Sequence, residues 1–137
     1  MVYVEIISGL WIGNVDMMYN KKFLQDNQIT LIINCTHNFK FSDLPNIKNI
    51  RIPLSDILLH NIDQLRKHKD KILTFIDTSL EQHNMLLCCY DGITNSPFIV
   101  SLYLITYGSI AKDNIKKIIQ SKSTEISMDY DLSLLDL

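Results

Sequence analysis

The chain has 137 residues, a formal net charge of −2 and ordinary globular proportions, with 47% hydrophobic and 20% charged residues. We expect one domain spanning residues 1–137. The charge gives no field that would attract nucleic acid, and the longest apolar stretch, residues 98–107, is too short to cross a membrane.

The first half of the chain predicts strands and one helix. The expected elements, in chain order, are strands 2–7 and 10–12, a helix over 16–27, and strands 29–34 and 47–52. The run 29–34 is β-branched and apolar throughout, which is typical of a strand covered on both faces. Pro53 ends the last of these strands because it offers no backbone donor to a sheet.

The second half alternates helices with one further buried strand. The expected elements are a helix over 62–80, a strand over 85–89, an apolar helix that opens at Ser96-Pro97, a helix over 113–120 and a last helix over 128–137. Proline is tolerated in the first turn of a helix. Because strands and helices alternate, we predict an α/β fold with a sheet covered by helices.

The three cysteines, Cys35, Cys88 and Cys89, are an odd number without CxxC spacing. They argue against a secreted disulfide framework and against zinc, so we expect a reducing, cytoplasmic location. If Cys88 and Cys89 lie on a strand, they point to opposite faces. The four histidines are scattered without ligand spacing, and we expect no metal or organic cofactor. No signal peptide is visible.

Residues 86–97 are the most informative segment. A buried strand is followed by a short loop that contains Gly92, and then by the start of a helix. Such a loop directs backbone N–H groups and the positive end of the helix at one point, which favours an anion, and Cys89 would lie in that field. The alternative is that both cysteines are simply small apolar core residues. The local sequence does not decide between these two interpretations.

This segment resembles the signature His-Cys-x-x-Gly-x-x-Arg-Ser of cysteine-dependent phosphatases. Segments 7–14, 29–36 and 52–56 are similar to the opening strand pair, the central strand and the general-acid loop of the dual-specificity branch. The resemblance covers about residues 6 to 120 in the right order. It implies a dual-specificity-phosphatase-like α/β fold with a central, mostly parallel sheet flanked by helices.

The resemblance also implies roles for single residues. Cys89 takes the position of the nucleophile, Asp56 that of the general acid, and Ser96 that of the serine that assists breakdown of the phosphocysteine intermediate. Asp56 also fits a loop or helix-capping residue, and Ser96 fits an N-cap. The phosphate loop would consist of Cys89, Tyr90, Asp91, Gly92, Ile93, Thr94 and Asn95.

Two positions depart from the signature. Cys88 replaces the histidine, and Asn95 replaces the arginine whose guanidinium grips the phosphoryl oxygens. Loss of such a clamp costs about 10²–10³-fold in rate. Only two arginines, Arg51 and Arg66, are present, and neither is expected to reach the loop. We therefore expect a Cys89 pKa that is less depressed than in the family, and vestigial catalytic positions.

Three functions remain open. The first is a catalytically inactive pseudophosphatase that binds a protein partner, either phosphorylated or not. The second is a degenerate but active phosphatase for a specialised phosphate substrate. In the third, a structural or oligomerising protein, Asn95 or Asp91 would fold across the former pocket. The sequence leaves a homodimer open as well.

The composition carries a hint of source. The chain has 21 Ile and 11 each of Asn and Lys, against one Ala and two Arg. These residues have AT-rich codons, which indicates a large DNA virus such as a poxvirus or any other organism with an AT-rich genome. For a virus, the expected location is the host cytoplasm.

Overall fold

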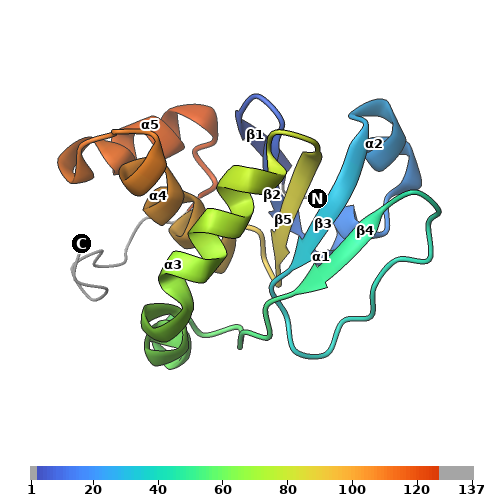
Figure 1. Cartoon of the computed structure of the whole chain (residues 1–137), viewed down its shortest axis with the longest axis horizontal. Coiled ribbons are helices and arrows are strands. Elements are labelled where there is room, and N and C mark those ends of the chain that lie inside the picture. Colours follow the sequence, from blue (N-terminus) through green and yellow to red (C-terminus); the bar gives the residue numbers. More distant parts are fainter. Residues whose placement is uncertain (1–2, 127–137) are drawn as a thin grey trace.

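The computed structural model describes residues 3–126, and its centre is a five-stranded sheet in the order β1-β2-β5-β3-β4 (Figure 1). The strands are β1 (Tyr3–Ile7), β2 (Leu10–Asn14), β3 (Ile29–Asn34), β4 (Lys48–Arg51) and β5 (Asn84–Cys89). Only β1 is antiparallel to its neighbour, and the other pairs are parallel. The predicted α/β class with a mostly parallel sheet is confirmed.

Helices cover both faces of the sheet (Figure 1). One face carries α3 (Ile62–Ser79), α4 (Asn95–Tyr107) and α5 (Ile115–Lys122), and the other carries α1 (Val15–Met18) and α2 (Lys21–Asp26). Two short 3₁₀ turns, η1 (Leu58–Asn61) and η2 (Lys112–Asn114), precede α3 and α5. Within residues 3–126, no helix is long and apolar enough to pass through a bilayer.

The two central strands, β3 and β5, divide their side chains between these faces. Ile33 and Leu87 belong to the core under α3 and α4, whereas Ile32 and Leu86 belong to the core under α1 and α2. This division explains why both runs are apolar at nearly every position. The predicted bounds 29–34 agree with β3, and 85–89 differs from β5 by one residue.

The helix predicted over residues 16–27 is wrong, because two short helices, α1 and α2, stand there. Asn20 lies in extended backbone between them, and its side chain accepts a hydrogen bond from the Phe23 N–H at 2.9 Å. It is therefore the N-cap of a new helix. In one continuous helix, Lys21 would share the face of the buried Met17 and Met18, but its side chain is exposed.

The predicted α4 begins one residue earlier than expected, at Asn95, and is buried from Asn95 to Leu104. Such a helix is apolar on all sides because it lies between the sheet and other helices. The helix predicted over 128–137 lies outside the described residues.

The Asn20 cap gives a stability prediction. Replacing Asn20 with alanine removes the acceptor for the Phe23 N–H, and the free energy of unfolding should fall by about 1 kcal/mol. The matched control is Asn114→Ala, because Asn114 precedes α5 without a side-chain capping bond, and it should change stability by less than about 0.5 kcal/mol. Urea denaturation measures both, and equal losses would contradict the capping role.

Candidate active site: a phosphatase-type loop with its own carboxylate

The loop between β5 and α4 begins at the carboxyl end of a strand that pairs with β2 and β3. Gly92 is its tightest point. Its φ is +75°, and a Cβ there would lie 2.7 Å from the Asn14 backbone nitrogen at the end of β2. Glycine alone avoids both the strained backbone and this clash. The loop is thus fixed against the neighbouring strand end.

Cys89 ends β5 and is 1% exposed, in the core under α3 and α4. The Ser96 N–H donates a hydrogen bond to the Cys89 Sγ at 3.4 Å. The structure therefore brings together the two residues that the resemblance places at the nucleophile and the assisting serine. The Ser96 Oγ is buried and has no hydrogen-bond partner among the described residues.

Asp91 folds back onto the loop that contains it. Its Oδ1 accepts hydrogen bonds from the N–H groups of Ile93 at 3.0 Å and Thr94 at 3.2 Å, and its Oδ2 accepts one from the Thr94 hydroxyl at 2.8 Å. The same Oδ1 lies 3.6 Å from the Cys89 Sγ, which donates to it. A carboxylate of the protein itself thus occupies two of the N–H groups that the loop offers to an anion.

This environment raises the pKa of the Cys89 thiol above its ordinary value. Burial is the largest cause, and the negative charge of Asp91 raises the pKa further. The hydrogen bonds from Ser96 and the Gly92 backbone act in the opposite direction but do not outweigh burial. We infer that Cys89 is a protonated thiol at neutral pH, in line with the expectation from the missing histidine and arginine.

Asn95, which stands at the arginine position of the resemblance, is 1% exposed, and its amide is bound to other protein groups. Its Nδ2 donates to the Ser55 carbonyl at 2.8 Å, and its Oδ1 accepts from the Asn61 Nδ2 at 3.2 Å. Asn61 in turn accepts from the Ser55 N–H at 2.8 Å. This buried amide network joins the start of α4 to the loop before α3.

The sequence reasoning did not identify Asn61, which is 2% exposed and lies at the end of η1. An asparagine between His60 and Ile62 is a weak signal of a buried polar contact. Its partner Asn95 is 34 residues away, and only the folded chain shows the pair.

Asp56 lies in the loop that this network holds, next to Ser55. Its side chain is exposed, and within residues 3–126 its carboxylate has no hydrogen-bond partner. The geometry is compatible with an acid that is free to approach a bound group, and equally with a solvated loop residue.

Tyr90 fixes the other side of the loop. Its hydroxyl donates to the Leu54 carbonyl at 2.9 Å and accepts from the His37 N–H at 3.0 Å, and its ring packs edge-on against Phe39. The Tyr90 side chain thus packs against the neighbouring loops and holds the position of its own loop.

Cys88 points away from the site, as the strand alternation predicts. It is fully buried in the core under α1 and α2, with its Sγ 3.8 Å from the Met18 sulfur. Burial is the main reason that its pKa rises to about 12. Cys35, Cys88 and Cys89 are all free thiols.

Neither arginine takes the place of the missing clamp. The Arg51 guanidinium donates to the carbonyls of Thr36 at 2.8 Å and Phe39 at 2.7 Å, and stacks on the Phe41 ring. Arg66 pairs with Asp63 on the exposed surface of α3. For residues 89–96, none of the hydrogen bonds or ion pairs found in the described part of the chain comes from a lysine or an arginine side chain.

Comparison with known proteins identifies the family to which this loop belongs. The sequence model "Dual specificity phosphatase, catalytic domain" matches residues 10–134. The chain belongs to this family. The match spans strands β2 to β5, the loop that follows β5, and Asp56.

Dual-specificity phosphatases also appear among relatives and solved structures. The chain is 32% identical over 107 residues to "MAP kinase phosphatase with leucine-rich repeats protein 1" of Dictyostelium discoideum, a match that covers 77% of this chain and 12% of that protein. It is 26% identical over 107 residues to "Dual specificity protein phosphatase 14" of Mus musculus, covering 77% and 52%. The chain thus spans from about an eighth to about half of the length of these relatives.

The fold is likewise that of a solved dual-specificity phosphatase. The structure of human DUSP28 superimposes with a TM-score of 0.84 at 16% identity, covering 97% of this chain and 92% of that one. At this identity, the likeness concerns the fold alone.

The raised pKa of Cys89 can be tested by alkylation. The rate of Cys89 modification by iodoacetamide, followed by mass spectrometry across pH, should give an apparent pKa above the ordinary thiol value. Asp91→Asn should lower this pKa, because it removes the charge next to Sγ and keeps an oxygen acceptor for the loop. The same change at the exposed Asp43 should have no effect. A Cys89 pKa below 7 in the wild type would contradict this account of the site.

Proposed function

We propose that this chain is a pseudophosphatase, a member of the dual-specificity family that does not hydrolyse phosphate esters and acts as a protein-binding module. The observation that carries the proposal is the Asp91 carboxylate, which accepts the N–H groups of Ile93 and Thr94 beside Cys89. Three features of the loop support inactivity: its charge, its missing clamp, and the raised pKa of its nucleophile, to which that charge contributes.

The charge of the loop opposes a phosphate dianion. Phosphoryl transfer is catalysed chiefly by donors and positive charges arranged around the transferring group. Here a negative charge lies within the loop, 3.6 Å from the sulfur that would attack. Two unit charges of the same sign about 4 Å apart repel each other by about 4 kcal/mol at an effective dielectric constant of 20, and solvent reduces this at the exposed Asp91. Binding would require Asp91 to turn away and release its hydrogen bonds.

Asn95 cannot act as the clamp, because its amide already makes hydrogen bonds within the protein. Its donor and acceptor bind Ser55 and Asn61. Turning it toward a phosphoryl group would leave buried polar groups unpaired, at a cost of about 1–3 kcal/mol for each group. An arginine at this position would supply two parallel charged donors, whereas the neutral amide supplies none to the loop.

The nucleophile is poorly activated. Attack on phosphorus needs a thiolate, and burial together with Asp91 favours the thiol form of Cys89. The missing arginine also removes a positive charge that would favour the thiolate.

A protein partner selected without phosphate fits these features best. The closed loop, with Asp91 across the former pocket, is the arrangement expected of a structural or oligomerising protein, and it equally disfavours a partner bound through phosphate. Two exposed aliphatic side chains, Ile57 at 49% and Leu59 at 71% exposure, lie just after Asp56 and offer apolar contact area beside the site. Both relatives are named as phosphatases, an activity that we do not assign to this chain.

One observation favours the alternative of a degenerate phosphatase for a specialised substrate. The Ser96 N–H still donates to the Cys89 Sγ, and Asp56 is exposed with a free carboxylate. A substrate that displaces Asp91 would contact these two remaining features of a phosphatase site.

Hydrolysis of an aryl phosphate decides between these two functions. Pure wild-type protein and Cys89→Ser should release aryl alcohol at the same background rate, because Asp91 lies where the phosphoryl group would bind, the clamp is missing and Cys89 is held as a thiol. Circular dichroism should show that both proteins are folded. A rate in the wild type that exceeds background and disappears in Cys89→Ser would overturn the proposal and establish the degenerate enzyme.

A further inference from the structure

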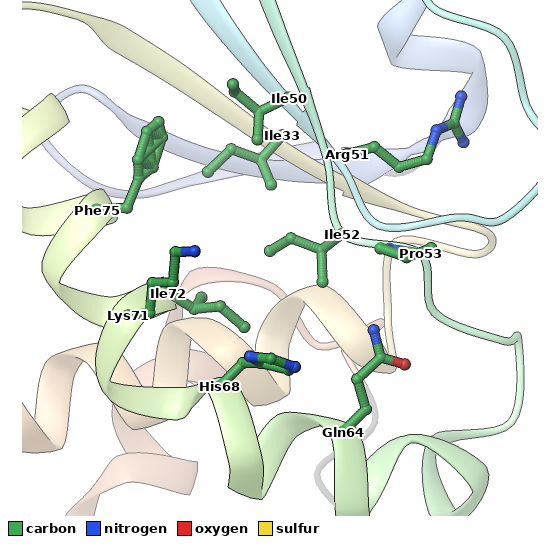
Figure 2. Close-up of a pocket in the computed structure, with 10 residues that line it drawn as sticks. All are labelled: Ile33, Ile50, Arg51, Ile52, Pro53, Gln64, His68, Lys71, Ile72 and Phe75. Carbon is green, nitrogen blue, oxygen red and sulfur yellow. The ribbon is translucent and has the colours of Figure 1, made fainter.

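A second surface of the molecule, separate from the Cys89 loop, has the features of a binding site. A cavity of about 470 Å³ lies between β4 and α3, and Figure 2 shows its lining. Ile50 and Ile52 face it from the strand side, and Ile72 and Phe75 face it from the helix, all four being only partly buried. Its volume is within the range of binding pockets, and its walls are mostly apolar.

The rim of this β4–α3 groove is positive. His68 and Lys71 border it from α3, and the Lys48 Nζ lies 5.8 Å from the centre of the Phe75 ring. None of the described residues that line the cavity is acidic. Arg51 contributes its backbone and stem, because its guanidinium points away and is bound to Thr36 and Phe39 (Figure 2).

The strand beside the groove is the last of the sheet. Within residues 3–126, β4 pairs only with β3. The Ile52 N–H donates to the Asn34 carbonyl at 2.9 Å, so the even-numbered residues of this segment direct their backbone groups to β3. By the alternation of a strand, the N–H and C=O groups of Asn49 and Arg51 point outward. An unpaired edge of this kind can accept an additional strand.

We propose that the β4–α3 groove and the edge of β4 together bind an extended peptide in which an aliphatic residue lies between acidic residues. The peptide backbone pairs with Asn49 and Arg51, as in recognition by strand addition. Every second side chain of a strand points to the same face, so an aliphatic side chain enters the groove between Ile52 and Ile72. Acidic residues two positions before and after it meet Lys48 at one end and Lys71 and His68 at the other.

This inference goes beyond the proposed function and does not depend on it. The groove contains none of the residues of the Cys89 loop. If the groove binds no peptide, the proposal that the Cys89 loop is inactive is unaffected. If the protein hydrolyses phosphate esters, the proposal for the groove is unaffected.

The test uses a labelled seven-residue peptide with one leucine, an aspartate two residues before it and an aspartate two residues after it, all other positions being serine. Titrated into the ¹⁵N-labelled protein, it should shift the amide signals of Ile50, Ile52, Ile72 and Phe75. At saturation, deuterium exchange of the Asn49 and Arg51 amides should slow, which groove filling alone does not produce. The same peptide with asparagine for both aspartates should bind more weakly.

A matched pair of variants tests the charges. Lys71→Glu should weaken binding about five- to tenfold, because an attraction becomes a repulsion. Lys67→Glu makes the same change on an exposed position of α3 outside the groove, and should alter binding less than twofold. Both variants should unfold at the temperature of the wild type within a few degrees.

Three outcomes would overturn the proposal. The first is equal weakening by the two variants. The second is groove signals that shift with protein concentration alone, which would assign the surface to a second copy of the chain. The third is that octanoate produces the same amide shifts as the peptide, and that neither ligand slows deuterium exchange at Asn49 and Arg51. This result would assign the groove to small amphiphilic acids.

Discussion

Two backbone N–H groups beside Cys89, those of Ile93 and Thr94, need an acceptor, and Asp91 supplies it from within the same loop. The requirement comes from the fold. A short loop between a buried strand and a helix directs its N–H groups at one point, which favours an anionic acceptor. In a working phosphatase of this type, an oxyanion of the substrate would meet this need. In this structure the Asp91 side chain meets it.

The rest of the loop is built around that interaction. Gly92 lets the loop lie close to the end of β2. The Tyr90 hydroxyl hydrogen-bonds to the segments after β3 and β4, and the Asn95 side chain hydrogen-bonds from the start of α4 to Ser55. These contacts draw the general-acid loop and the phosphate loop toward each other through protein groups alone. The loop is thus held in place by protein groups, with Asn95 at the position that an arginine takes in the family signature.

The sequence predicted the sheet and the loop well, because their patterns are local. The apolar runs at β3 and β5 and the turn at Gly92 each depend on neighbouring residues. The opposed directions of Cys88 and Cys89 follow from strand alternation and are confirmed by the two separate cores. The family resemblance supplied the order and spacing of these parts, and the family match confirms it.

The features that the sequence did not predict depend on three-dimensional geometry or on contacts between residues far apart in the chain. The division of residues 16–27 into α1 and α2 depends on whether Asn20 caps a helix or lies inside one. The local sequence is compatible with either position. The contact of Asn61 with Asn95 joins residues 34 positions apart. The β4–α3 groove arises from the spacing of two elements that no sequence window contains.

The central claim, that Asp91 takes the place of a bound anion, can be measured directly at the two amides that it binds. Inorganic phosphate is titrated into ¹⁵N-labelled protein at constant ionic strength, and the signals of Ile93 and Thr94 are followed. In the wild type they should move no more than in a chloride control, whereas in Asp91→Ala, with both N–H groups released, they should shift in a saturable way. Asp43→Ala should behave like the wild type. Saturable binding of phosphate by the wild type, as strong as that by Asp91→Ala, would contradict the account.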